Sequence, residues 1–117
     1  MSSLLPDTNL LTFALFLLGK RKRLKVVGDS MLPWLRAGEE ILIDPKAYTK
    51  SKPEINDIVA IAHPLKPNLT IVKRVKAIAD DGKYFLIGDN PAASTDSRHW
   101  GNVTHQQIIG KVTNFFA

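Results

Sequence analysis

Ser30 lies in a turn-forming hexapeptide, Gly28-Asp29-Ser30-Met31-Leu32-Pro33, that directly follows a predicted strand. A flexible glycine before the serine and a proline after it would present the serine oxygen outward and leave backbone N–H groups free nearby. A hydroxyl nucleophile beside free N–H donors is what a serine hydrolase with an oxyanion hole requires. An ordinary turn held by local hydrogen bonds explains the same residues, so the hexapeptide alone does not decide between the two.

Lys73 is the second residue whose position could support chemistry. Strand alternation places Ile71, Lys73 and Val75 on one face, and Arg74 and Lys76 on the other. Lys73 is therefore the one charged group on an otherwise apolar face. Burial would lower the pKa of its amine, and a neutral amine can accept a proton from a serine hydroxyl. A lysine near a sheet edge that extends to water fits the periodicity equally well.

A third segment, residues 88–102, is rich in Gly, Asn, Ser, Asp and Pro and predicts a loop. Asp96 and Arg98 could pair to brace it, and Ser94 could form a hydrogen bond with the lysine amine. A plain hydrophilic loop is the alternative. We favour a functional segment, because long loops without secondary structure tend to be functional in compact domains.

Other catalytic chemistries are less well supported by the composition. The chain has no cysteine, which excludes disulfides, a cysteine nucleophile and thiolate metal sites. His63, His99 and His105 do not have metal-ligand spacing, so we expect no metal. A Ser-His-Asp triad is not excluded by counting, but His63 and His99 each fit a turn. There is no phosphate-binding glycine loop, and we expect no cofactor.

The chain after Gly19 predicts short strands separated by turns. We expect strands at residues 24–27, 40–44, 57–62, 70–79, 84–87 and 107–116. Asp81-Gly82 predicts a hairpin turn. Short strands without long helices between them favour a mainly β fold, a compact barrel-like domain with one short N-terminal helix within residues 7–18. We divide the 117 residues into an N-terminal apolar and basic segment, 1–23, and a single domain, 24–117.

The N-terminal segment joins an apolar run, residues 10–18, to a basic run, residues 20–25. The apolar run is shorter than the ~20 residues that a membrane-spanning helix needs. The net charge of +5 equals the five positive charges of the basic run, so the rest of the chain has no basic surface that would suggest nucleic-acid binding. We expect a cytoplasmic protein whose residues 10–25 pack on the domain or contact an anionic membrane peripherally. A solvated charged turn is the alternative for the basic run.

Together these segments resemble the type I signal peptidases, a family of serine–lysine proteases. The resemblance extends over residues 25–112 and rests on motifs that occur in the family's order. The motifs are Gly28-Asp29-Ser30-Met31-Leu32-Pro33 with Leu35 and Gly38, Asp57-Ile58-Val59, Val72-Lys73-Arg74-Val75, and Gly88-Asp89-Asn90 followed by Ser94, Asp96-Ser97-Arg98 and Gly101. The fold that this implies is the barrel-like catalytic core of a signal peptidase.

The resemblance also implies roles for individual residues. Ser30 would be the nucleophile, Lys73 the general base, and Ser94 the group that orients the lysine amine. Asp96 and Arg98 would form a structural ion pair near the site. The resemblance thus implies a serine-type endopeptidase with a Ser-Lys dyad, a mechanism that needs neither a cofactor nor a metal.

Gly28 is a departure from part of the family. Some members have a side-chain hydroxyl two positions before the nucleophile that contributes to the oxyanion hole. Gly28 cannot supply it, so the Ser30 N–H would act with a second donor that the sequence does not identify. Lys73 and Ser94 are also only 21 residues apart, without the large insertion that many members carry.

The short core and the basic run at residues 20–25 resemble the small branch that matures nickel-type superoxide dismutase. We therefore predict removal of an N-terminal leader from that precursor, which would bind as an extended peptide. General signal peptidase activity on secretory precursors is the alternative. A self-cleaving regulator is disfavoured because only 29 residues precede Ser30. A catalytically silent binding module is disfavoured because it would have no need for a buried lysine.

Overall fold

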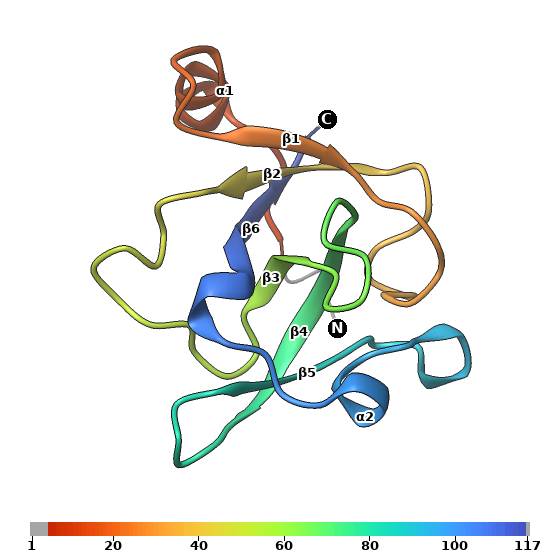
Figure 1. Ribbon diagram of the computed structural model, residues 1–117. Coiled ribbons are helices and arrows are strands. Elements are labelled where there is room, and N and C mark those ends of the chain that lie inside the picture. The colour runs from red at the N-terminus through yellow and green to blue at the C-terminus, as the bar shows by residue number, and fades with distance from the viewer. Residues whose placement is uncertain (1–4, 117) are drawn as a thin grey trace.

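The computed structural model describes residues 5–116. Within them, six strands form one antiparallel sheet (Figure 1). The strands are β1 (Lys22–Lys25), β2 (Glu40–Asp44), β3 (Ile58–Ala62), β4 (Thr70–Ile78), β5 (Tyr84–Ile87) and β6 (Ile108–Phe115). Their spatial order is β1-β2-β6-β3-β4-β5, so β1 and β5 are the edges. The predicted mainly β class is confirmed, but the sheet does not close into a barrel.

Most predicted strands are found within one residue of their predicted ends, but the first is not. It was expected at residues 24–27, whereas β1 spans Lys22–Lys25 and so begins before the predicted domain boundary at residue 23. The chain leaves the strand at Val26, which is buried in the core, and Gly28 then adopts a positive φ of 79°. This turn carries the chain from the sheet edge into the Ser30 segment.

Residues 88–102 were expected to be loop throughout, and this was wrong. They contain a 3-10 turn at Pro91–Ala93 and a short helix, α2 (Ser97–Trp100). The helix begins at Asp96, whose carboxylate accepts a hydrogen bond from the Arg98 N–H and caps the first turn. One side chain therefore both ends the loop and starts the helix.

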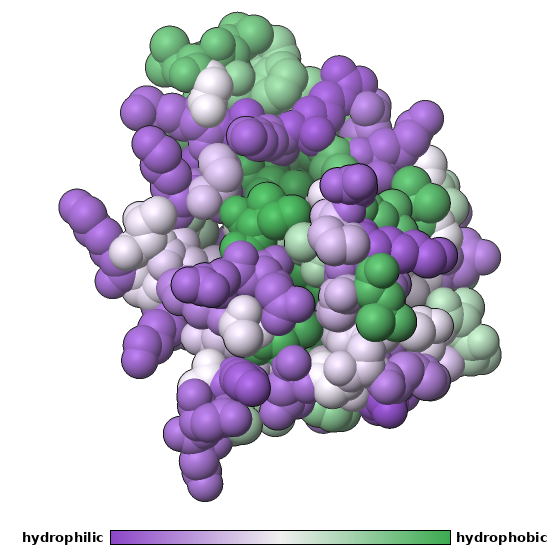
Figure 2. All heavy atoms as spheres, in the orientation of Figure 1, coloured by the Kyte–Doolittle hydropathy of each residue, from purple (hydrophilic) through white to green (hydrophobic). Residues whose placement is uncertain are grey.

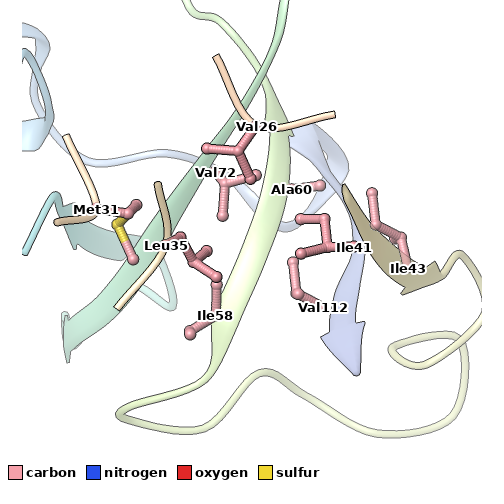
Figure 3. Close-up of a cluster of buried hydrophobic side chains, with 9 residues drawn as sticks. All are labelled: Val26, Met31, Leu35, Ile41, Ile43, Ile58, Ala60, Val72 and Val112. Carbon is pink, nitrogen blue, oxygen red and sulfur yellow. The ribbon is translucent and has the colours of Figure 1, made fainter. Parts of the chain in front are cut away.

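Apolar side chains are buried on both faces of the sheet, and β3 contributes to both. Ile58 and Ala60 point into one cluster, which Figure 3 shows together with Val26, Met31 and Val72. Val59 and Ile61, at the alternate positions, belong to a second cluster. This explains why β3 and the central part of β4 are buried continuously, without the alternation of a half-exposed strand.

The predicted N-terminal helix is present as α1 (Leu10–Leu17). The Asn9 side chain accepts a hydrogen bond from the Thr12 N–H and caps it. Phe16 lies edge-on to Phe116, with ring centres 5.0 Å apart, so the helix is held against the C-terminal end of β6. In the part of the chain that the structure describes, no helix has the length and apolarity needed to cross a membrane.

Candidate functional site

Lys73 lies in the middle of β4 with only 3% of its surface exposed. Its strand is paired with β3 on one side and β5 on the other, so the backbone around it is fixed. Burial lowers the pKa of the Lys73 amine, and the nearby Asp96 carboxylate opposes this shift only in part. A lysine that loses its proton more readily than usual is a suitable general base.

Ser94 is the hydrogen-bond partner of the lysine. The Lys73 Nζ lies 3.2 Å from the Ser94 Oγ, and the Ser94 hydroxyl lies 2.6 Å from the Asp96 Oδ2. Because the carboxylate can only accept, Ser94 donates its proton to Asp96 and accepts from Lys73. A neutral lysine that donates to Ser94 keeps its lone pair free for another proton, so this chain of bonds orients the amine.

Asp96 is completely buried and anchors the segment. It forms two hydrogen bonds with the Arg98 guanidinium, of 2.9 and 2.6 Å, and accepts a third from the Gly88 N–H at 2.9 Å. Burial alone would raise the pKa of this carboxyl. The hydrogen bonds from Arg98, Ser94 and Gly88 outweigh burial and hold the pKa well below its usual range.

Ser30 and Lys73 line the same pocket, which has a volume of about 230 Å³. Gly28 and Asp29 line it on the side of the serine. Apolar side chains that line it include Val26, Met31, Ile71 and Val72. The structure thus brings two residues 43 positions apart in the sequence to one partly apolar hollow.

Gly88 lies where two parts of this site come close together. A Cβ atom at this position would be 2.3 Å from the Ser94 Oγ and 2.6 Å from the Ser30 carbonyl oxygen. Both distances are shorter than any real Cβ contact, so only glycine fits. The close packing brings the Ser30 turn and the segment of Ser94 together across a single residue.

Several residues at the site had no role in the sequence analysis. Arg74 is buried and forms two 2.8 Å hydrogen bonds with Asp89, although alternation had placed it on the outer face with Lys76. Asn90 contacts the backbone of the Ser30 turn. His63 lines the pocket while its Nδ1 accepts two backbone N–H groups of its own turn. The order of the motifs along the sequence gave no signal for these long-range contacts; only the local turn at His63 could be predicted.

Among residues 5–116, no group of three His, Asp or Glu side chains is arranged to hold a metal ion. The site consists of hydroxyl, amine, carboxylate and guanidinium groups.

A mainly β fold in which a buried lysine and a serine line one pocket is compatible with a hydrolase. The chain belongs to the peptidase S26 family of signal peptidases. The family model "Signal peptidase, peptidase S26" matches residues 8–81 and 79–117, which together contain all of the predicted site residues.

Individual relatives agree with this family. The chain is 32% identical over 108 residues to the mitochondrial ATP-independent inner membrane protease subunit 1a of Arabidopsis thaliana, an alignment that covers 74% of this chain and 64% of that protein. It is 26% identical over 131 residues to the probable signal peptidase I-1 of Synechocystis, covering 73% and 65%. The chain therefore spans less than two thirds of the length of these relatives.

Proposed function

We propose that this protein is a serine endopeptidase that removes an N-terminal leader peptide from a precursor protein. The observation that carries the proposal is the buried Lys73, hydrogen-bonded to Ser94 and lining one pocket with Ser30. Membership of the signal peptidase family gives the reaction class, and the pocket gives a place for an extended peptide.

In the proposed mechanism, Lys73 in its neutral form accepts the proton of the Ser30 hydroxyl. The Ser30 oxygen attacks the scissile carbonyl, and backbone N–H groups stabilise the oxyanion of the tetrahedral intermediate. Lys73 then gives the proton to the leaving amine, which leaves an acyl-enzyme on Ser30. A water molecule, activated by Lys73, hydrolyses this ester and regenerates the serine.

The shape of the site suggests how the precursor binds. The pocket is lined by residues 24–31 and 70–73, together with His63, Ala93 and Thr95. β1 is an edge strand, and an extended peptide can add to such an edge through main-chain hydrogen bonds. The pocket volume of about 230 Å³ favours small side chains next to the scissile bond, because larger ones would not fit.

As the specific substrate we propose the precursor of nickel-type superoxide dismutase. The supporting observation is the minimal connection between Lys73 and Ser94, which consists of the end of β4, the Asp81-Gly82 turn, β5 and residues 88–93. A secretory precursor is the second candidate, because a relative is named as a probable signal peptidase.

A mixed incubation tests the substrate. Wild-type protein and Ser30→Ala would be incubated with each precursor, and mass spectrometry would identify new N-termini. We expect serine-dependent cleavage of the dismutase precursor and none of the secretory one. Cleavage of the secretory precursor alone would show that a secretory precursor is the substrate and that the dismutase precursor is not. If the wild type cleaves neither precursor, or Ser30→Ala cleaves as fast, the proposed peptidase activity is contradicted.

We also propose that α1 and the basic run attach the protein peripherally to an anionic membrane surface, from the cytoplasmic side. Leu10, Leu17 and Leu18 are 85%, 68% and 71% exposed. Figure 2 shows this apolar surface over α1 with hydrophilic atoms directly beneath it. Arg21 and Arg23 are paired with Asp44 and Glu40, whereas three lysines of the run form no ion pair with a described residue. These are Lys20, Lys22 and Lys25.

Vesicle binding tests this attachment. We expect the full chain to sediment with vesicles that contain ~30% anionic lipid and to bind neutral vesicles less. Each lysine near the surface contributes about 1 kcal/mol, so Lys20→Glu with Lys22→Glu should weaken binding to anionic vesicles at least about 30-fold, because the added carboxylates are also repelled. Leu10→Ser with Leu17→Ser should weaken binding to both anionic and neutral vesicles. Lys50→Glu and Leu65→Ser, at exposed sites elsewhere, are the controls. Equal binding by all variants would contradict the proposal.

A further inference from the structure

Asn90 holds the backbone of the Ser30 turn by two hydrogen bonds. Its main-chain N–H donates to the Ser30 carbonyl at 2.8 Å, and its side-chain Nδ2 donates to the Asp29 carbonyl at 3.1 Å. These are the carbonyls on either side of the proposed nucleophile. The turn is therefore fixed from outside at two successive peptide units.

The side-chain contact with Asp29 determines more than the position of a carbonyl. The Asp29 C=O and the Ser30 N–H belong to one planar trans peptide unit, in which the two groups point in opposite directions. A hydrogen bond that fixes the Asp29 carbonyl consequently fixes the direction of the Ser30 N–H. By polarising the peptide, the same bond also makes this N–H a stronger donor.

The Ser30 N–H is itself unoccupied. It donates no hydrogen bond to any residue in the described range, 5–116, although the neighbouring N–H groups of Leu32 and Asn90 do. An oxyanion hole needs such a donor, already aimed and not bonded elsewhere. Because Gly28 has no hydroxyl to contribute, the Ser30 N–H carries a larger part of this stabilisation than it would beside a second side-chain donor.

Asn90 is in turn held rigidly. The preceding residue, Asp89, forms a two-bond ion pair with Arg74, and both side chains are about 90% buried. Arg74 also donates to the Asn56 carbonyl at 3.0 Å. On the other side of Asp89, Gly88 packs directly against the Ser30 carbonyl. The amide of Asn90 is thus attached to β4, the strand that carries Lys73.

We propose that Asn90 is a positioning residue that aims the Ser30 N–H at the oxyanion. The inference rests on the proposed peptidase function, because it assigns Asn90 a part in that reaction. Asn90 is not among the residues that line the pocket. Its side chain acts through the Asp29–Ser30 peptide plane. Its loss should therefore weaken stabilisation of the transition state and leave substrate binding unchanged.

Kinetics of Asn90→Ala test the catalytic part. Losing an oxyanion donor outright costs about 10²–10³-fold in rate, and misaiming one should cost about tenfold in kcat with KM unchanged. A peptide aldehyde, which forms a tetrahedral adduct with Ser30, should lose affinity by the same factor. The rising limb of the pH profile, where Lys73 loses its proton, should not move. Asn102→Ala, at an exposed position, is the matched control.

Nuclear magnetic resonance tests the positioning part independently of activity. In Asn90→Ala, the Ser30 amide resonance should shift and exchange with solvent faster, whereas Asn102→Ala should leave it unchanged. An unchanged Ser30 amide, or unchanged aldehyde affinity beside a reduced rate, would overturn the inference. A shifted Ser30 amide in a protein whose wild type cleaves no peptide would leave the positioning intact and refute the peptidase function instead.

Discussion

Replacing Lys73 with methionine is expected to abolish peptide cleavage and, at neutral pH, to make the protein more stable. Methionine has a similar length and no proton to exchange, so the base is lost while the space stays filled. General base catalysis contributes about 10²–10⁴-fold, and the rate should fall by at least this factor. Few substitutions are expected to damage activity and improve folding at once.

The gain in stability follows from the lowered pKa of Lys73. In the unfolded chain the amine keeps its proton up to its ordinary pKa near 10.5, whereas burial makes the folded protein release it at lower pH. Between these two pKa values the unfolded state binds more protons, so the free energy of unfolding rises with pH there. Below this range the buried ammonium costs stability, and Lys73→Met removes that cost.

Denaturant unfolding measured at several pH values checks this. The variant should be more stable than the wild type at pH 7, and the difference should shrink as the pH approaches 10.5. The rate of cleavage by the wild type should rise with pH through the lowered pKa of Lys73. Lys76→Met, on the exposed end of the same strand, is the matched control and should change neither quantity. A variant that is less stable at neutral pH, or that still cleaves, would contradict the assignment.

Strand alternation placed Lys73 on an apolar face and left its burial as one of two possibilities, but it gave no indication that Arg74 is buried. Alternation assigns a face to each side chain and assumes that one face is exposed. β4 is central in the sheet and covered on both faces, so Arg74 is also buried. It is tolerated there because Asp89 pairs with it, and a partner 15 residues away across a turn is a tertiary contact that periodicity does not encode.

The difference between local signals and tertiary contacts also explains what the sequence could predict for the N-terminal segment and for residues 88–102. The apolar run predicted a helix, but the side on which α1 packs depends on Phe116, at the opposite end of the chain. In residues 88–102 the turn-forming composition predicted a loop, so α2 was missed. Its signal was local, because Asp96 accepts from the first turn and His99 completes the capping box. The pairing of Asp96 with Arg98 was predicted, whereas its bond to Gly88 needed the fold.

Replacing Asp96 with alanine is the substitution expected to destabilise the protein most. It leaves the Gly88 N–H and the Ser94 hydroxyl without their acceptor and Arg98 without its partner. Buried polar groups that lose a partner cost about 1–3 kcal/mol each, so we expect a loss of about 3 kcal/mol. Asp80→Ala, at an exposed position, should stay within about 0.5 kcal/mol of the wild type.

The milder variant Asp96→Asn separates charge from shape. The pKa of Asp96 lies below its ordinary value near 3.8, so its charge stabilises the fold above that pH, and this contribution is lost as the pH falls toward the lowered pKa. The variant should therefore lose less stability than the wild type below about pH 4. If Asp96→Asn loses as much stability as the wild type below about pH 4, this account is contradicted.

Activity of Asp96→Asn links the two predictions. The Asp96 carboxylate raises the pKa of Lys73, and Arg98 lowers it. Removing the carboxylate leaves burial and Arg98 acting in the same direction, so the Lys73 amine should lose its proton at still lower pH. The rising limb of cleavage, where Lys73 loses its proton, should then move to lower pH, even though the weakened hold on Ser94 reduces the maximal rate. A limb that moves the other way would show that Asp96 acts on Lys73 by something other than its charge.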